Sequence, residues 1–539
     1  MTILIKSVPK LRWSLAARLS CAVIAAVCSA MFLPGVARSQ APAPALVRVT
    51  PWEFGARPGD CSTDASTALL RAAREAVRRG AVLWTGDGCL AIANTFVPPA
   101  GLIWRSDFSE AHRLIWTGPR SFDVVEVTAP IDLDGIVIDG GRPARLNRFS
   151  STLAGNDARA LLAIHGSLAT DQPAPLGGVR IGRVRVENSG WSTGVLGVNL
   201  RGLQVDRIEA NGIWGVATMW SGVIDSFVNI VAADDTGQFG KEGARAGQVV
   251  AIYAEIDPRK RPAKFFVLAD QDKPSRNILE TRGLKFGQIE TRANTDTAVY
   301  VHDYPGGRAG QGIGVSGIAI GTITGDLIGK DLFKVRQYAG GVSVGSITGK
   351  RIGARIVSVE DHAHDITIGS ITGSDFGYDV VGAMIGRAAQ FDGTDYGRGI
   401  GFGQTLSTNA VAISVLDGAR NVSINSGSVR GVPASWDGKN GYGLLITDAD
   451  TVKVRLSIAD TAGAGVRLAN STRFDIEADV SRSCKKRCIA AVVLADDGNG
   501  PVHDGRIVYR LHGIVGLGQT VRRIEASGRM QNVTVIERP

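Results

Sequence analysis

A short apolar segment that repeats at a fixed interval constrains this chain more than any other feature. The segments Ile318–Gly325, Val342–Gly349 and Ile366–Gly373 read IAIGTITG, VSVGSITG and ITIGSITG, and each begins 24 positions after the one before. Apolar residues alternate with small or polar ones, which is the pattern of a half-buried β-strand. Because one such strand cannot bury its apolar face alone, the period predicts a solenoid in which each coil stacks on the next.

Fainter copies of the same strand extend this pattern over most of the chain. A leucine-rich repeat has a similar period, but its Leu-x-x-Leu-x-Leu pattern with Asn is missing. The sequence therefore predicts an all-β chain folded as a single-stranded parallel β-helix, with coils of about 24 residues and neighbouring strands about 4.8 Å apart. We expect this domain to span residues 92–539, with its largest insertions at 232–247, 257–264 and 386–406. The fainter copies begin at Val179, Leu203, Leu284, Val422, Val452 and Phe474.

The composition agrees with a solenoid. With 539 residues, the chain is too long for one ordinary compact core. Its 68 glycines indicate many tight turns, and its 21% of charged residues argue against global disorder. The net charge of +9 suggests a polyanionic partner, but five of the 60 basic residues lie in the first 40 positions, which contain no acidic residue. The remaining 55 basic residues are nearly balanced by 51 acidic ones. An acidic ligand would therefore have to bind to a local cluster of basic residues.

The segment 1–40 has the features of a secretory signal peptide. Four basic residues between Lys6 and Arg18 form a positive start, and the apolar stretch Cys21–Phe32 that follows is short for a membrane span. We expect cleavage near position 40 and a mature protein in the periplasm or outside the cell, with no integral membrane segment. An uncleaved signal anchor is the alternative.

Four cysteines remain after such a cleavage. Cys61 is close in sequence to Cys89, and Cys484 to Cys488, so an exported chain predicts the local disulfides Cys61–Cys89 and Cys484–Cys488. Half of a metal site at the second pair is the alternative, although no His or further Cys pair lies nearby in the sequence. We expect no metal centre and no cofactor; calcium on loop carboxylates stays open, without diagnostic spacing.

The segment 41–91 is predicted to cover the open end of the solenoid, as terminal coils require. One of the polar residues 62–64 can cap a helix that runs from Ala68 to Val77 and ends at Gly80. Its apolar face would consist of Leu69, Leu70, Ala73 and Val77.

The same segment carries a recognisable motif. Trp52–Asp60 (WEFGARPGD), followed by Thr63-Asp64 and Thr67-Ala68, resembles the start of the pectate-lyase-like (pectin lyase fold) right-handed β-helix superfamily, although Asp60-Cys61 departs from its usual Asp-Gly. The resemblance implies the β-helix fold. It does not imply one activity, because the superfamily includes polysaccharide lyases, glycoside hydrolases, epimerases and phage tailspikes.

Known active-site motifs of this superfamily are incomplete in the chain. Asn294-Thr295-Asp296 matches the first motif of polygalacturonase-type hydrolases, but the later Gly-His-Gly and Arg-Ile-Lys motifs are missing. The Asp-Pro-His-Asp signature of alginate epimerases is missing as well. The resemblance therefore assigns no catalytic residue.

The repeat phase stacks polar side chains in the middle of the solenoid. Val301, Val335 and Val359 each lie 17 positions after the start of a strand copy, and we expect them to point inward and their neighbours outward. The same count places Gly382–Gly386 in the next coil, where the polar rows would end. The three outward rows are Tyr300, Lys334 and Ser358; His302, Arg336 and Glu360; and Tyr304, Tyr338 and His362.

This exposed stack is the candidate site, because carbohydrate sites combine aromatic rings with polar groups in this way. An ordinary solvated face with cross-strand ion pairs is the alternative. Cleavage of a uronate polymer by β-elimination needs a cation for the carboxylate, a base and an acid. We expect Lys334 or Arg336 to be the cation, His302 or His362 the base, and Tyr304 or Tyr338 the acid. Tyr300, Tyr304, Asp303 and Asp361 are the candidate substrate-binding residues.

Three functions stay open for an exported carbohydrate-active β-helix protein. The first is a lyase for an acidic polysaccharide. The second is a glycoside hydrolase that pairs Glu360 with Asp303 or Asp361, or an epimerase on the same fold. The third is a non-catalytic protein that binds polysaccharide or serves exopolysaccharide assembly. The expected partner is a polysaccharide or oligosaccharide and not nucleic acid; the oligomeric state stays open.

Overall fold

The computed structural model describes residues 47–118, 123–141, 160–168, 172–189, 193–213, 215–240, 243–245, 248–253, 278–303, 314–378, 411–434, 441–485, 490–495, 500–513, 522–526 and 529–539. Residues 48–539 form one compact unit. The predicted signal peptide lies outside the described residues. None of the helices in the described part is both long and apolar enough to cross a membrane.

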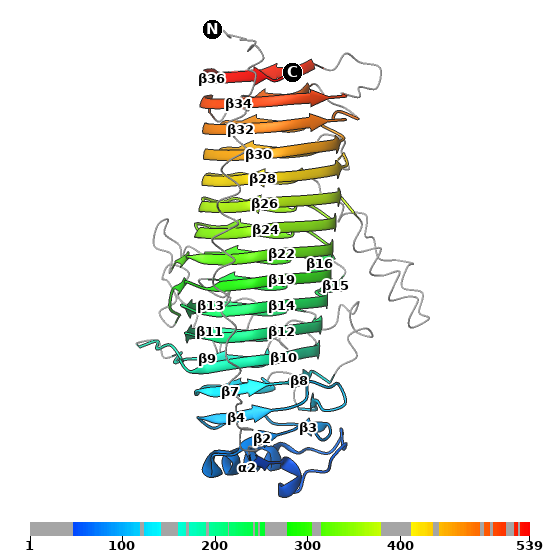
Figure 1. Cartoon of the computed structure of the whole chain (residues 1–539), viewed down its shortest axis with the longest axis vertical. Coiled ribbons are helices and arrows are strands. Elements are labelled where there is room, and N and C mark those ends of the chain that lie inside the picture. The colour runs from blue at the N-terminus through cyan, green and yellow to red at the C-terminus, as the bar shows by residue number, and fades with distance from the viewer. Residues whose placement is uncertain are drawn as a thin grey trace, which may run out of the picture. The chain divides into compact units, whose positions relative to one another are not determined.

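Strands from successive coils form two large sheets in which every pairing is parallel, and they stack in one column (Figure 1). In the described residues, sheet A has 19 strands and sheet B has 15. Sheet A consists of β1 (Arg48–Val49), β2 (Val82–Trp84), β3 (Leu90–Ile92), β4 (Leu102–Arg105), β5 (Leu114–Trp116), β7 (Ile131–Asp134), β8 (Ile136–Asp139), β10 (Val179–Ser189), β12 (Gln204–Ile213), β14 (Phe227–Thr236), β19 (Lys285–Asn294), β22 (Ile318–Ile328), β24 (Gly340–Ile352), β26 (His364–Phe376), β28 (Arg420–Val432), β30 (Asp450–Thr461), β32 (Thr472–Ser481), β34 (Val502–His512) and β36 (Met530–Glu537).

Sheet B is built from shorter strands. It consists of β6 (Val125–Val127), β9 (Ala160–His165), β11 (Thr193–Arg201), β13 (Thr218–Ile224), β17 (Val250–Tyr253), β18 (Thr281–Arg282), β20 (Val299–His302), β21 (Val315–Ser316), β23 (Phe333–Arg336), β25 (Val357–Val359), β27 (Val411–Val415), β29 (Tyr442–Thr447), β31 (Val466–Ala469), β33 (Ala490–Ala495) and β35 (Arg522–Ala526).

This arrangement confirms the predicted all-β parallel β-helix. Ile318 pairs with Val342, and Val342 pairs with Ile366, so the repeat period of the sequence is the length of one coil there. The apolar positions of each repeat are buried in one continuous core that extends through both sheets. Each coil thus supplies its neighbours with the apolar surface that a single strand lacks.

Each repeat contains two glycines, and a Cβ atom would clash with different neighbours at the two positions. A Cβ atom on Gly345 would lie 2.4 Å from the carbonyl oxygen of Gly321 in the preceding coil, and one on Gly369 would lie 2.4 Å from that of Gly345. A Cβ atom on Gly349 would instead lie 2.8 Å from Cδ2 of Leu332 in the core. At the first position the backbone of the preceding coil leaves no room for a Cβ atom, whereas at the second glycine avoids crowding against the end of the Leu332 side chain.

A 14-residue helix, α2 (Ser66–Arg79), packs at the N-terminal end of the column and ends at Gly80 (Figure 1). Its predicted N-terminal cap is wrong: the N-cap is Ala65, and Asp64 lies one residue earlier, where its carboxylate accepts the backbone N–H groups of Ser66 and Ala93. The predicted face also shifts, because Val77 is exposed. The buried face consists of Ala68, Leu69, Ala72, Ala73 and Ala76.

The motif before the helix forms a short 3-10 turn, η2 (Pro51–Phe54), and hydrogen bonds from Thr50 to Glu53 hold its start. The backbone N–H and the hydroxyl of Thr50 both donate to Glu53 Oε1, at 2.8 and 3.0 Å. Sheet A already begins here, because β1 pairs with β2. The segment predicted as a cap thus contributes strands as well as a helix.

The predicted insertion at 232–247 is wrong in its first part. Residues 232–236 continue β14 in sheet A, and the following residues include the antiparallel hairpin of β15 (Gln238–Gly240) and β16 (Gly243–Arg245). The insertions predicted at 257–264 and 386–406 lie outside the described residues.

The disulfide Cys61–Cys89 is confirmed, with 5.3 Å between the two Cα atoms. It joins the loop before α2 to the residue before β3. A cross-link over 28 residues restricts the unfolded chain and stabilises a domain by about 2–4 kcal/mol. Cys484 is disulfide-bonded and buried, whereas its predicted partner Cys488 lies outside the described residues.

Candidate functional site

Adjacent strands of sheet B carry the predicted polar stack. Tyr300 pairs with Lys334, and His302 pairs with Arg336, across β20 and β23. Lys334 pairs in turn with Ser358 across β23 and β25. The inward residues Val301, Val335 and Val359 are fully buried. The predicted strand register and the inward valines are therefore confirmed.

The predicted end of the stack is wrong. The next neighbour of β25 is β27, which places Ser414 beside Ser358 and Val415 beside Val359. The hydroxyl of Ser414 donates to Ser358 Oγ at 3.3 Å, so the polar row continues by one more coil. Residues 382–386, which the constant count placed there, lie outside the described residues.

The stack is also less open than predicted. Ser358 is fully buried, and His302 and Glu360 are only 8% and 9% exposed. Arg336 is the most accessible of the charged groups on these strands, with 39% of its side chain exposed. The outward rows thus divide into a buried ionic network and an accessible part at the turns that follow the strands.

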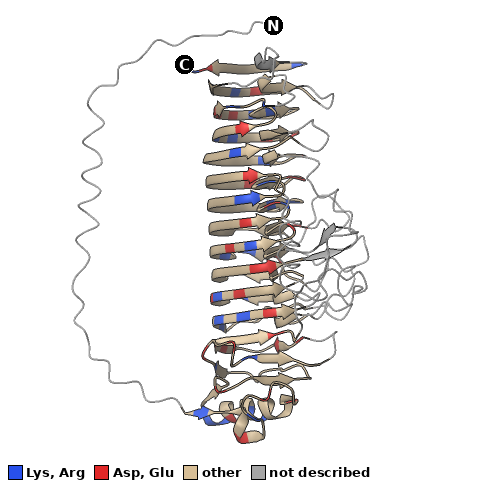
Figure 2. Cartoon of the chain, turned by 90° about the vertical axis from the view of Figure 1, so that its right-hand side faces the viewer, with Lys and Arg blue, Asp and Glu red and all other residues tan. Residues whose placement is uncertain are grey.

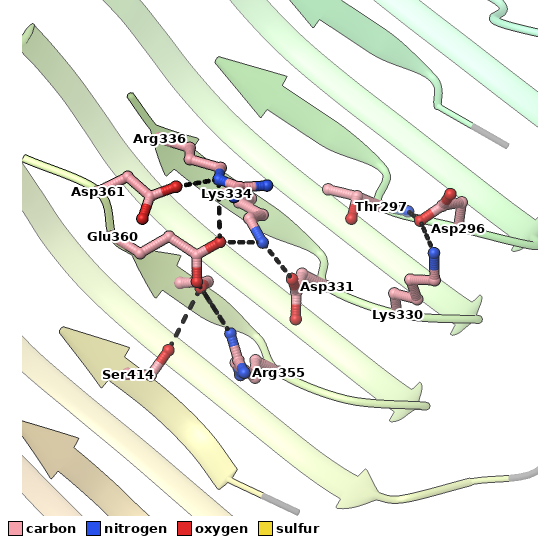
Figure 3. A network of polar contacts seen from close by, with 11 residues as sticks. Asp296, Thr297, Lys330, Asp331, Lys334, Arg336, Arg355, Glu360, Asp361 and Ser414 are labelled. Atoms are coloured by element: carbon pink, nitrogen blue, oxygen red, sulfur yellow. Dashed lines mark hydrogen bonds and ion pairs between the residues drawn. The ribbon is translucent and has the colours of Figure 1, made fainter. Parts of the chain in front are cut away.

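Glu360 is the centre of the buried network (Figure 3). Its Oε1 atom contacts Lys334 Nζ and lies 3.6 Å from Arg336 Nε. Its Oε2 atom lies 3.5 Å from Arg355 Nη1 and accepts the Ser358 hydroxyl at 3.4 Å. Both carboxylate oxygens are therefore occupied by partners within the chain.

Sequence reasoning missed two members of this network. Arg355 Nη1 donates to Ser358 Oγ at 2.9 Å, and Asp331 Oδ2 lies 3.8 Å from Lys334 Nζ. Burial raises the pKa of Asp331 against the opposing effect of Arg355 and Lys334. Asp331 and Arg355 precede their strands by two residues each, so a search confined to the strand positions passes over them.

Successive turns after the strands place a second group of side chains on top of one another. Tyr338 N–H donates to the Asp361 carbonyl at 3.0 Å, and His362 N–H donates to the Asp417 carbonyl at 2.9 Å. The rings of Tyr338 and His362 are stacked, with 4.9 Å between their centroids and an interplanar angle of 21°. The Tyr338 and His362 part of the third predicted row therefore forms a ring stack, whereas Tyr304 lies outside the described residues.

The backbone at these stacked positions is left-handed. Tyr338 has φ 61° and His362 has φ 64°, and the equivalent residue of the next turn is Gly418, with φ 78°. Glycine adopts this conformation freely, whereas a residue with a Cβ atom is strained in it. Strained positions of this kind cluster at functional sites, where the side chain is needed in spite of the cost.

Arg336 connects the two parts of the stack. Its Nε atom contacts Asp361 Oδ2, next to the ring of His362. Burial opposes the charge of Arg336, but the hydrogen bond to Asp361 and the neighbouring Tyr300 raise its pKa above the usual value. The guanidinium thus stays charged and is held by Asp361, the residue that precedes His362 in the chain. Arg336, Tyr338, Asp361 and His362 are called the turn cluster below.

The remaining predicted residues lie deeper. The rings of Tyr300 and His302 are 5.2 Å apart and tilted by 41°. Burial raises the pKa of Tyr300 to about 12, in spite of Arg336 nearby. Burial also raises the pKa of Asp303, against backbone hydrogen bonds from Val315 and Gly314 that favour its charged form. His302 and Asp303 are buried, whereas Tyr300 is partly exposed.

The described residues contain no group of three or more His, Cys, Asp and Glu side chains placed to hold a metal ion. The chemistry available in the turn cluster is that of a guanidinium, a phenol, a carboxylate and an imidazole. The two parallel sheets define a parallel β-helix protein, and the turn cluster is its candidate site along sheet B.

Comparisons with solved structures find remote similarities. No protein-family model and no curated protein matches the sequence. The chain is similar to the A-module of mannuronan C-5 epimerase AlgE6 from Azotobacter vinelandii, with 11% identity, a TM-score of 0.41 and coverage of 91% of this chain and 99% of that module. The AlgE4 A-module gives 10% identity, a TM-score of 0.38 and coverage of 90% and 99%. The pre-mature gene product 12 of bacteriophage phi29 gives 10% identity and a TM-score of 0.41, with coverage of 90% of this chain and 72% of that one. At these values the likeness concerns the fold alone.

Proposed function

We propose that this chain is an exported polysaccharide lyase that cleaves an acidic polysaccharide by β-elimination at the turn cluster. The observation that carries the proposal is that a tyrosine and a histidine occupy consecutive left-handed turn positions, at φ 61° and 64°, where the next turn has glycine. Their rings stack on each other, and the accessible Arg336 contacts Asp361, the residue before His362. Export is supported by the predicted signal peptide and by the Cys61–Cys89 disulfide.

Each member of the turn cluster has a role in the proposed reaction. Arg336 binds the uronate carboxylate and stabilises the negative charge that develops on it. His362 removes the proton on the carbon next to that carboxylate, and the released electron pair forms a carbon–carbon double bond. The bond to the leaving glycosidic oxygen breaks, and the Tyr338 hydroxyl protonates this oxygen. Asp361 contacts Arg336 Nε, and Tyr300 also hydrogen-bonds to this guanidinium, so both residues hold Arg336 in place.

Hydrolysis through Glu360 has less support. A glycoside hydrolase needs one carboxyl group that donates a proton and another that acts as a nucleophile or a base. Both oxygens of Glu360 are occupied by Lys334, Arg336, Arg355 and Ser358, so this carboxylate is held for a structural purpose. Among the described neighbours, Asp361 is bound to Arg336 as well.

The direct test is to incubate the mature protein with polymers of mannuronate, guluronate, galacturonate and glucuronate. We expect one of them to yield unsaturated uronate ends, seen as a rise in ultraviolet absorbance. New reducing ends without this absorbance would indicate hydrolysis, and an altered uronate composition without chain cleavage would indicate epimerisation. Either result, or no product from any polymer, would contradict the proposal.

The strained turn gives a prediction that separates function from folding. His362→Gly should reduce the lyase rate about 100-fold or more, because it removes the base. The free energy of unfolding should change by no more than about 1 kcal/mol, because relief of the left-handed strain offsets the loss of the ring stack. Measured rates and denaturant unfolding of the purified variant check both parts.

Thr451→Gly is the matched control for this variant. Thr451 is also left-handed, with φ 56°, but it lies at the start of β30 on sheet A. We expect a similar small change in stability and an unchanged rate. A His362→Gly protein that keeps its rate would remove His362 from the mechanism.

A further inference from the structure

Sheet A carries a groove that the proposed reaction does not use. It has a volume of about 460 Å³, within the range of sites that bind small molecules. The groove crosses five neighbouring strands, β10, β12, β14, β19 and β22, and all its lining residues are described. Four strand spacings of about 4.8 Å give it a length of about 19 Å along the stack. It is therefore long enough for several units of an extended chain.

Small side chains form the floor of the groove. Ala210 and Ala233 are buried and paired across β12 and β14, and Ala232 lies between Glu209 and Glu290 in the neighbouring row. A methyl group at this place leaves a gap between two longer side chains, which is why a depression exists on an otherwise flat sheet. The floor thus follows from the small residues of β12 and β14.

Charged groups of both signs form the walls of the groove. On one side, Arg185 Nη2 lies 2.8 Å from Glu209 Oε2, and its Nη1 lies 3.2 Å from Glu110 Oε1. On the other side, Arg292 is exposed and lies between Asp234 and Asp326 in the strand register. Figure 2 shows that acidic and basic positions are interspersed along the stacked strands. The walls therefore offer donors and acceptors in alternation.

Two of these groups have unused hydrogen-bonding capacity. Glu290 Oε1 accepts from Gln288 Nε2 at 2.5 Å, whereas its Oε2 atom has no hydrogen-bond partner among the described residues. Arg292 makes no ion pair with any described residue, although aspartates lie on both neighbouring strands. An acceptor and a donor are thus available two residues apart on β19, on one side of the alanine floor.

The chemistry of the walls selects the class of ligand. Five carboxylates and two guanidinium groups line the groove, so its charge is negative and repels a polyuronate. Sugar hydroxyls both donate and accept, so they match a wall of alternating carboxylates and guanidinium groups. We propose that this groove binds an uncharged glycan chain along the solenoid axis. The proposal does not depend on the reaction at the turn cluster.

Calorimetric titration with two sets of oligosaccharides tests this proposal. The probes are uncharged gluco-, galacto- and manno-oligosaccharides on one side, and oligouronates and oligomers of glucosamine on the other. We expect at least one uncharged oligosaccharide to bind the full-length mature protein, with an affinity that changes little with salt. Binding that is confined to the charged probes, or no binding at millimolar concentration, would overturn the proposal.

Two variants place the binding in the groove. Ala232→Phe should fill the floor and reduce the affinity at least about tenfold, without removing a hydrogen-bonding group. Glu290→Gln keeps the shape and should weaken binding about tenfold, since hydrogen bonds to a charged group are the stronger ones. Ala319→Phe is the control, because Ala319 is also partly exposed on sheet A but does not line the groove.

The outcomes distinguish this proposal from the proposed lyase activity. We expect Ala232→Phe and Glu290→Gln to keep the full rate on oligouronates. Unchanged affinity in both variants would show that an uncharged glycan binds elsewhere, and this would overturn the inference. If Ala232→Phe fails to fold, Glu290→Gln alone decides.

Discussion

Arg336→Ala is expected to lower the lyase rate by a factor of about 100 to 1,000, since a single group that stabilises the developing charge typically contributes this much. The substrate carboxylate would lose its cation, so the adjacent proton would no longer be acidic enough for His362 to remove. The fall should appear mainly in kcat, because the charge on the carboxylate is greatest in the transition state. Initial rates of unsaturated-product formation measure it.

Two further variants test whether the loss of rate is due to the missing guanidinium. Arg336→Lys keeps the charge but loses the planar fork, so we expect a partial recovery of the rate. Arg506→Ala removes an exposed arginine that pairs with Asp475 on sheet A, at 2.9 Å, and should leave the rate unchanged. Equal losses in Arg336→Ala and Arg506→Ala would point to a general effect on the fold.

Glu360→Ala is expected to have the largest effect on stability, a loss of about 3–5 kcal/mol in the free energy of unfolding. The variant would leave Lys334 and Arg355 inside the protein without the carboxylate that both of them contact. A buried charge without its partner costs far more than the net gain of the original pair. Denaturant unfolding followed by circular dichroism measures this loss.

The control is an ion pair of similar type at the surface. Asp475→Ala breaks the contact with Arg506, in which both side chains are well exposed, and should cost no more than about 1 kcal/mol. A Glu360→Ala protein as stable as Asp475→Ala would show that water reaches the network around Glu360. In that case Glu360 would again become a candidate catalytic group.

The fold and the register of the site could be predicted because they depend on local alternation and a constant coil length. Where the coil length does not change, the position of each strand follows from that of its neighbour. Ile318, Val342 and Ile366 therefore pair as expected. The stacking of Tyr300 on Lys334 and of His302 on Arg336 follows from the same alternation.

The next coil was predicted wrongly because loop length is not fixed by strand pairing. A longer loop costs little extra closure entropy, so an insertion does not disturb the strands that it connects. Counting forward from Ile366 crosses such an insertion and arrives at Ala383. Counting backward from the start of each sheet A strand copy finds the correct inward valine. Val359 lies seven residues before Ile366, and Val415 lies seven residues before Val422. The short turn from sheet B to sheet A is the constant feature in these coils.

The burial of the polar stack and the groove on sheet A could not be predicted from the alternation of apolar and polar residues. Both depend on contacts between side chains of different coils. Ser358 and Glu360 are at outward strand positions and are nevertheless buried. The groove on sheet A takes one to three residues from each of five strands, although β14 ends at Thr236 and its neighbour β19 begins only at Lys285. A small residue between two glutamates in one row, such as Ala232, is the signal that a register-based search would need.

A crystal structure of the His362→Gly variant with a bound oligouronate would test the central claim most directly. The account predicts that a uronate carboxylate lies within hydrogen-bond distance of the Arg336 guanidinium, with the glycosidic oxygen of the same unit next to the Tyr338 hydroxyl. A ligand bound away from the turn cluster, with no contact to Arg336, would contradict it.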